Sequence, residues 1–177
     1  MNRPHTFATA LVFSLGAALS ACAQSVAPAA ARTETPPQPA ANASPVVELP
    51  EVLVHKDPNC GCCTLWIDHM REEGFKVRVS EEVDVGAVKQ RVGVPFGKGS
   101  CHTAEVGGYF VEGHVPAQDI KRLLAEKPKA KGLTVPGMPM GSPGMEVPDG
   151  SVQPYTVELV TQEGSTLPYA QHGSVSE

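Results

Sequence analysis

Three cysteines lie within four positions of one another, and this cluster limits the chain more than any other feature. The stretch Asp57–Trp66 reads DPNCGCCTLW and holds Cys60, Cys62 and Cys63, three of the five cysteines in 177 residues. Sulfurs crowded around one turn of chain must share a disulfide, a metal or a redox reaction. Which of these they share depends on the compartment in which the protein works.

The first 22 residues predict export from the cytoplasm. Arg3 precedes an apolar run from Phe7 to Leu19, which is short for a bilayer span and is typical of a removed signal peptide. The motif LSAC at residues 19–22 resembles the bacterial lipobox, so we expect lipidation at Cys22 and a lipid anchor in the outer membrane. Ordinary cleavage after Ala23 is the alternative. Both routes lead to the periplasm.

Composition divides the rest of the mature chain. Residues 23–48 are almost all Ala, Pro, Ser, Thr, Gln and Asn, which cannot bury enough apolar surface to fold, so we expect a disordered linker. We expect one domain at residues 49–165 and a tail at residues 166–177. The net charge of −5 includes no basic stripe, which argues against nucleic acid. We expect membrane contact only through the lipid anchor.

The hydrophobic pattern predicts an α/β domain. In the first helix Cys63, Trp66, Ile67 and Met70 form one apolar stripe. The predicted order is β-α-β-α-β-β-α with an additional C-terminal loop and strand, and this order is thioredoxin-like. The expected strands are Glu51–His55, Phe75–Val79, Thr103–Val106, Tyr109–Val111 and Tyr155–Val160, and the expected helices run from Cys60 to Glu73, Asp84 to Gly93 and Pro116 to Pro128.

The cysteine spacing favours a metal over a simple redox pair. Cys60 and Cys63 form a C-x-x-C pair, but Cys62 adds a third sulfur inside it. The free N–H groups and dipole of a helix N-terminus favour thiolates, and three neighbouring thiolates repel one another unless a soft cation lies among them. Cys101 precedes the third predicted strand, which in a thioredoxin-like fold faces the start of the first helix. We therefore expect it to supply a fourth sulfur.

Methionines point to copper as that cation. Met138, Met140 and Met145 occur in one Pro/Gly-rich loop, where a helix or strand does not absorb them. Thioethers suit Cu(I), whereas zinc gains little from methionine, and calcium or magnesium prefers carboxylates. Each single methionine also has an ordinary explanation as a core residue. The sequence predicts copper, held as several ions in a thiolate cluster.

The histidines add less. His102 adjoins Cys101 and can bind the harder Cu(II), so it joins the expected ligands. Three others have structural explanations as a strand end, an exposed helix position and a strand terminus: His55, His69 and His114.

Two alternatives remain open. The first is a thiol–disulfide oxidoreductase in which Cys60 attacks and Cys63 resolves the mixed disulfide. The second is a scaffold held by disulfides without metal, because four domain cysteines in an exported protein permit three pairings.

Four segments carry a family resemblance: DPNCGCC, GVPFGKGSCHTAEVGGYFVEGHVPA, KGLTVPGMP and GSPGME. Over residues 51–160 the chain resembles the exported CopG-like copper-resistance family. The resemblance implies a thioredoxin-like domain that binds several copper ions, acts beside other periplasmic copper proteins and interconverts Cu(I) and Cu(II). Carried over to this sequence, it implies cluster thiolates at Cys60, Cys62, Cys63 and Cys101, with Met138 as an outer ligand.

Overall fold

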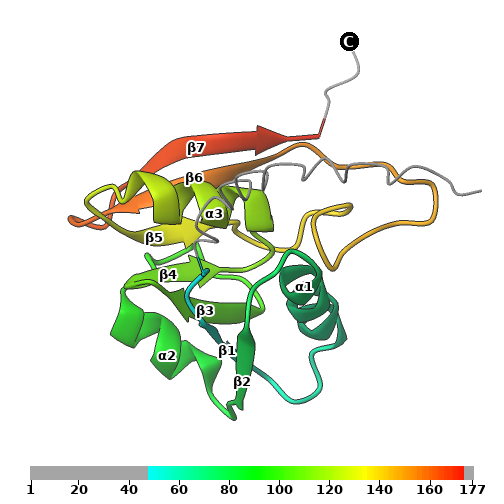
Figure 1. Ribbon diagram of the computed structural model, residues 1–177, viewed down its shortest axis with the longest axis horizontal. Helices are drawn as coiled ribbons and strands as arrows, with labels where there is room; N and C mark the ends of the chain where they lie inside the picture. Colours follow the sequence, from blue (N-terminus) through cyan, green and yellow to red (C-terminus); the bar gives the residue numbers. More distant parts are fainter. Residues whose placement is uncertain (1–47, 174–177) are drawn as a thin grey trace, which may run out of the picture. The chain divides into compact units, whose positions relative to one another are not determined.

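The computed structural model describes residues 48–173, which form three helices and seven strands (Figure 1). None of these helices has the length and apolar character that crossing a bilayer requires. In chain order the elements are β1 (Val52–Lys56), α1 (Gly61–Glu72), β2 (Val77–Glu81), α2 (Val85–Val92), β3 (His102–Val106), β4 (Tyr109–Glu112), α3 (Ala117–Glu126), β5 (Ala130–Thr134), β6 (Tyr155–Thr161) and β7 (Thr166–His172).

The strands form one mixed sheet in the order β2-β1-β3-β4-β5-β6-β7. The pairs β1–β2 and β4–β5 are parallel, and the other neighbouring pairs are antiparallel. The β3–β4 hairpin turns at Gly107 and Gly108, both with positive φ, as a tight two-residue turn demands. The predicted mixed α/β class and this hairpin are confirmed.

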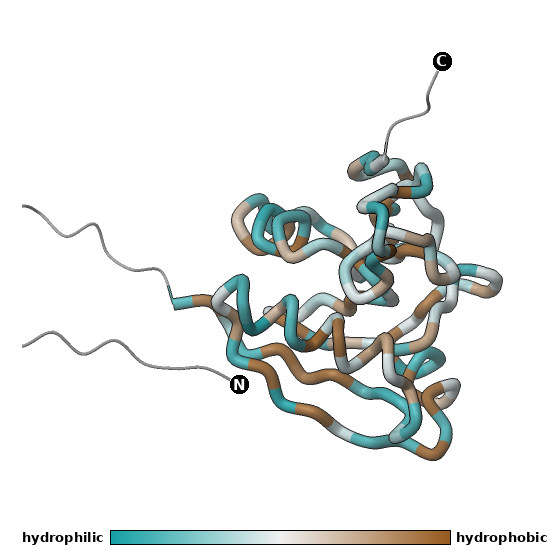
Figure 2. The backbone as a smooth tube through the Cα atoms, turned by 90° about the vertical axis from the view of Figure 1, so that its right-hand side faces the viewer, coloured by the Kyte–Doolittle hydropathy of each residue, from teal (hydrophilic) through white to brown (hydrophobic). Residues whose placement is uncertain are grey.

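One face of the sheet is covered by α1 and α3 and forms the hydrophobic core. Helix α1 buries the predicted stripe, and the Trp66 indole N–H donates to the Val115 carbonyl at 2.9 Å. Helix α3 contributes Ile120 and Leu123. Figure 2 shows brown hydrophobic stretches in the interior of the backbone trace and teal hydrophilic residues on many of the outer turns. The core residues from the strands and their ends are Val52, Val54, Ala104, Val106, Val111, Leu133, Val135 and Val157.

Helix α2 covers the opposite face, where charged side chains replace apolar ones. Asp84 caps it by accepting a hydrogen bond from the Gly86 N–H at 2.9 Å, and Gly93 ends it in the left-handed conformation, both as predicted. The Lys89 ammonium of α2 lies 2.6 Å from the buried Glu112 carboxylate of the sheet. Helix α2 is therefore joined to the sheet by an ion pair close to Cys101.

Two strands lie where the sequence predicts none. Strand β5 lies where the predicted order has only the Pro/Gly-rich C-terminal loop, and its Gly132 passes so close to β4 that a Cβ there would lie 2.0 Å from the Phe110 carbonyl oxygen. The segment predicted as a tail contains β7, which pairs with β6 at the edge of the sheet, where Pro168 is tolerated. Glycine and proline weaken the strand pattern, so both strands escape a sequence-based prediction.

The N-terminal predictions are outside the structure described. The signal peptide, the lipidation site Cys22 and nearly all of the linker lie within residues 1–47, for which the structure gives no description.

Candidate metal centre

The start of α1 presents three sulfurs on one turn. Cys60 is the N-cap of the helix, with extended backbone at φ −75° and ψ 97°, and Cys62 and Cys63 follow in the first turn. Cys63 is buried, whereas Cys60 and Cys62 are half-buried. The backbone N–H groups of the first turn make this end of the helix electropositive, which favours thiolates over thiols.

Two of these cysteines are joined in the structure. Cys60 and Cys63 form a disulfide with their Cα atoms 5.4 Å apart, because a separation of three residues places both on one side of a helix. Among the described residues, the free cysteines are Cys62 and Cys101. The structure therefore shows the site in its oxidised form, in which Cys60 and Cys63 are not thiols.

Cys62 lies at the centre of the sulfur cluster. Its Sγ atom is 3.6 Å from Sγ of Cys60, 4.0 Å from Sγ of Cys101 and 4.0 Å from Sδ of Met138. The four cysteine sulfurs all lie within 4.8 Å of one another. Ligands from three separate segments of the chain therefore converge on the Cys62 sulfur.

Cys101 links the sulfur cluster to two histidines. Its Sγ is 3.0 Å from Nε2 of His114 and 3.4 Å from Nδ1 of His102. The possible metal-ligating atoms of Cys101, His102 and His114 also lie within 4.8 Å of one another. Cys101 therefore belongs both to this group and to the four-cysteine cluster. A thiolate that bridges two metal ions needs this kind of shared position.

The protonation of His114 suits metal binding. Its Nδ1–H donates to the Pro143 carbonyl at 2.8 Å, which leaves the lone pair of a neutral ring on Nε2, facing Cys101. Burial lowers the pKa of His114, and the Pro143 carbonyl and Glu146 carboxylate offset this only in part. The ring is therefore neutral near pH 7, the form that ligates metals.

Burial affects Cys101 and His102 more strongly. It raises the pKa of the Cys101 thiol to about 11, with the Cys62 charge as the next cause. It also holds the pKa of His102 well below its usual range, and His114 adds to this effect. Without a cation the thiol stays protonated, so a bound metal ion must displace its proton.

His102 carries a buried nitrogen without a partner. Its ring is fully buried, 4.5 Å from the Trp66 ring and 5.1 Å from the His114 ring between centroids. Its Nε2 is one of the few buried side-chain nitrogens or oxygens in residues 48–173 that make no hydrogen bond. Such a group is costly to bury, and the ring nitrogen that faces the Cys101 sulfur is the other one, Nδ1.

The methionine loop lies over the cysteine helix. Gly144 has φ +82°, and a Cβ there would be 2.7 Å from the Trp66 backbone nitrogen and 2.8 Å from the Cys62 carbonyl oxygen. Only glycine permits this approach, which places the loop beside Cys62. The Met138 sulfur lies 4.0 Å from the Cys62 sulfur, whereas Met140 contacts none of the cysteine sulfurs, although the two residues are exposed alike at 50% and 48%.

The structure brings together six of the seven metal ligands predicted from the sequence and adds one. Met140 is the ligand that it leaves apart. The added residue is His114, for which the sequence pattern predicts only a place at a strand terminus. The hairpin contains the signal that identifies it, because Thr103 pairs with Glu112 and the same register continues to Cys101 opposite His114. The six are Cys60, Cys62, Cys63, Cys101, His102 and Met138.

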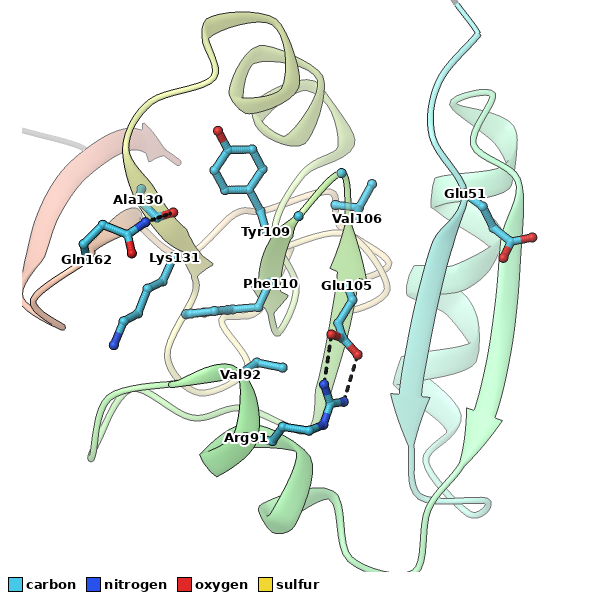
Figure 3. Close-up of a pocket in the computed structure, with 12 residues that line it drawn as sticks. Glu51, Arg91, Val92, Glu105, Val106, Tyr109, Phe110, Ala130, Lys131 and Gln162 are labelled. Carbon is cyan, nitrogen blue, oxygen red and sulfur yellow. Dashed lines mark hydrogen bonds and ion pairs between the residues drawn. The ribbon is translucent and has the colours of Figure 1, made fainter.

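One surface pocket of the described residues lies away from the metal centre. It has a volume of about 470 Å³ and lies beside α2 and the β3–β4 hairpin (Figure 3). Arg91 and Glu105 pair across part of it, and Lys131 projects from β5. It contains no cysteine, histidine or methionine, so it has no part in the soft-ligand chemistry.

The fold and site together define a class: an α/β domain with a soft-ligand metal centre of sulfur and imidazole. A family model described as "Protein of unknown function, DUF411" matches residues 98–145, which hold Cys101, both clustered histidines and the methionine loop. No curated protein sequence matches the chain.

Two solved structures are similar to the chain, and both are named "Copper resistance protein copG". Form 1 is 48% identical and covers 72% of this chain and 100% of its own, with a TM-score of 0.67. Form 2 is 49% identical and covers 71% of this chain and 99% of its own, also with a TM-score of 0.67. The chain belongs to the CopG family of copper resistance proteins.

Proposed function

We propose that this protein binds Cu(I) in a multi-cysteine site and serves copper resistance or homeostasis. The observation that supports this most directly is the convergence of soft donors from three separate segments of the chain. Cu(I) prefers thiolate and thioether ligands, and the similar solved structures are named for copper resistance. The proposed ligands are Cys60, Cys62, Cys63 and Cys101, with His102, His114 and Met138 beside them.

Several ions share these ligands in the proposed site. The Cys62 sulfur lies 3.6 Å from one cysteine sulfur and 4.0 Å from another, so one thiolate can touch two ions. Sharing reduces the repulsion between thiolates and lets few residues hold more copper. Zinc accepts the same cysteines and histidines, but it gains little from the Met138 thioether.

A second candidate function has a specific observation in its favour. The Cys60–Cys63 disulfide is the pairing that a thiol–disulfide oxidoreductase uses, with Cys60 at the exposed end of the helix and Cys63 buried beneath it. We also propose copper redox chemistry at the site, in which bound copper cycles between Cu(I) and Cu(II) by exchanging one electron with an external one-electron carrier, and the imidazoles can ligate the harder Cu(II). Cyclic voltammetry of the loaded protein tests this, since a protein without a reversible copper wave performs no such cycling.

The arrangement from β1 to α3 supports a further proposal, that this part of the domain is thioredoxin-like. Helix α1 follows β1 directly and carries the reactive cysteines at its start. Superposing residues 52–126 on a solved thioredoxin tests the proposal: a different strand order, or cysteines that do not coincide, would remove it.

The signal sequence supports a place in the cell envelope. We propose that the signal peptide is removed, that Cys22 carries a lipid and that the domain works in the periplasm beside other copper proteins. The intact mass of the purified protein tests this. A lipidated N-terminal cysteine is expected, and an unmodified chain that begins after Ala23 would show ordinary secretion.

Replacement of His114 tests the proposed ligand set. In the reduced protein loaded with Cu(I), X-ray absorption at the copper edge is expected to show mainly sulfur neighbours and a minor nitrogen contribution. His114→Ala should reduce the nitrogen signal, because Nε2 of this ring lies 3.0 Å from the Cys101 sulfur. His69→Ala is the control, since His69 bonds the Ala117 N–H outside the cluster. Copper surrounded only by oxygen and nitrogen would contradict the proposed function.

A further inference from the structure

A buried carboxylate lies behind the metal centre. Glu112 is the last residue of β4 and its side chain is fully buried. Burying an unpaired carboxylate is very costly, so the charge must be matched by nearby donors. The hydrogen-bond donors around the carboxylate show which parts of the chain Glu112 holds in place.

Three donors from three different segments meet the Glu112 carboxylate. Oε1 accepts from the Lys89 ammonium at 2.6 Å and from the Ser100 backbone N–H at 2.5 Å, and Oε2 accepts from the Thr103 hydroxyl at 2.7 Å. Hydrogen bonds to an ionised group are stronger than those between neutral groups. The carboxylate therefore joins α2, the loop before β3 and β3 itself at one point.

The Ser100 bond fixes the position of Cys101. Ser100 directly precedes Cys101, so the bond to its N–H fixes the Gly99–Ser100 peptide plane, one residue before the thiol residue. Gly113, with φ +74°, lets the chains come close here, because a Cβ at that position would lie 2.6 Å from the Ser100 side chain. The Glu112 side chain thus sets the position of the Cys101 sulfur. This sulfur belongs both to the four-cysteine cluster and to the group with His102 and His114.

The methionine loop is bonded to the backbone of the same residue and to the Cys101 loop. The Glu112 carbonyl accepts from the Val135 N–H at 3.0 Å, just where the chain leaves β5 toward Met138. The Ser100 hydroxyl donates to the Gly137 carbonyl, and the Gly137 N–H donates to the Gly99 carbonyl at 3.2 Å. The Glu112 carboxylate therefore holds the Cys101 loop directly and reaches the methionine loop through Ser100, while the bond to Val135 comes from the backbone of residue 112.

We infer that Glu112 is the positioning residue of the metal centre, which holds the Cys101 loop and the Met138 loop against the cysteines of α1. This inference rests on the proposed function for its consequence, the copper affinity. Its structural half concerns the metal-free protein and can be tested without copper.

The test measures alkylation of Cys101 in the metal-free protein by iodoacetamide, followed by peptide mass analysis. In Glu112→Ala the Cys101 loop loses its charge-assisted hydrogen bond, so Cys101 should react about tenfold faster or more. Glu112→Gln should stay close to the wild type. Its amide oxygen still accepts from Ser100 and Lys89, and its NH₂ group can donate to the Thr103 hydroxyl.

A matched control separates positioning from general loss of stability. Glu105 also pairs with an α2 side chain, Arg91, but it makes no bond to the Cys101 loop (Figure 3). Glu105→Ala should leave the alkylation rate of Cys101 unchanged. If Glu112→Ala does not fold, Lys89→Met with Glu112→Leu removes both charges and leaves Ser100 without its acceptor.

Copper affinity is the second measurement. Glu112→Ala should bind Cu(I) about 10–100-fold more weakly than the wild type in chelator competition, and Glu112→Gln should recover most of the affinity. Unchanged alkylation and affinity in both Glu112→Ala and the double variant would overturn the inference, as would a Gln variant that behaves like Ala or a Glu105→Ala variant that loosens Cys101 equally. A wild type that binds no Cu(I) would instead contradict the proposed function, and the alkylation rates would still decide the role of Glu112.

Discussion

Replacing Cys62 with Ser is expected to remove nearly all Cu(I) binding while the Cys60–Cys63 disulfide still forms. The Cys62 sulfur lies within 4.0 Å of two other cysteine sulfurs and of the Met138 thioether, so its loss removes the one sulfur that contacts all three. Serine offers a hard oxygen that suits Cu(I) poorly. The affinity in competition with a Cu(I) chelator should fall by more than the ~100-fold typical of outer-sphere changes.

The same variant distinguishes the two candidate functions. A dithiol oxidoreductase uses Cys60 and Cys63, so Cys62→Ser should largely keep its insulin reductase activity. Thr64→Ser is the control, because it alters a residue two positions further along the same helix without removing a sulfur. If Cys62→Ser binds copper like the wild type and only disulfide exchange matters, the copper site is contradicted and the oxidoreductase is supported.

Reduction of the Cys60–Cys63 disulfide is expected to raise the number of Cu(I) ions that each chain holds. The disulfide removes two of the four thiolates, which leaves Cys62 and Cys101 as free cysteines of the described domain. Reduction should not unfold the domain. A disulfide that closes so short a loop contributes only about 2 kcal/mol by chain entropy, against about 5–15 kcal/mol for a typical domain.

The measurement compares anaerobic Cu(I) titrations of oxidised and reduced protein, with the free thiols counted first. Cys63→Ser serves as the control, since it cannot form this disulfide and its capacity should not respond to oxidation of that pair. Equal copper capacity in the oxidised and reduced wild type would show that Cys60 and Cys63 are not ligands. A thiol count of zero in the oxidised domain would support the disulfide scaffold instead.

Local signals in the sequence were enough to predict much of the fold. The glycine pair at residues 107–108 identifies the β3–β4 hairpin, and the cap at Asp84 together with Gly93 sets the bounds of α2. Strand β5 was missed because Gly132 serves a close approach to another strand, which no local pattern reveals. Strand β7 was missed because its proline is tolerated only at a sheet edge.

The sequence predicts which residues form most of the site but not how they are arranged in space. Spacing alone placed three sulfurs on one turn, and the Cys101–His102 pair stood out as neighbouring soft ligands. His114 required the hairpin register to be extended past Glu112, and its tautomer depends on a carbonyl in a distant loop. The oxidation state of the cysteines cannot be read from spacing, because one sequence serves both the disulfide and the dithiol.

Metal analysis of the full-length protein tests the central claim most directly. The protein is purified without air from the envelope of copper-supplemented cells, and its copper and zinc are measured per chain. The proposed site predicts more than one copper ion per chain, held by sulfur and lost in Cys62→Ser. Zinc alone, or no bound metal, would contradict it.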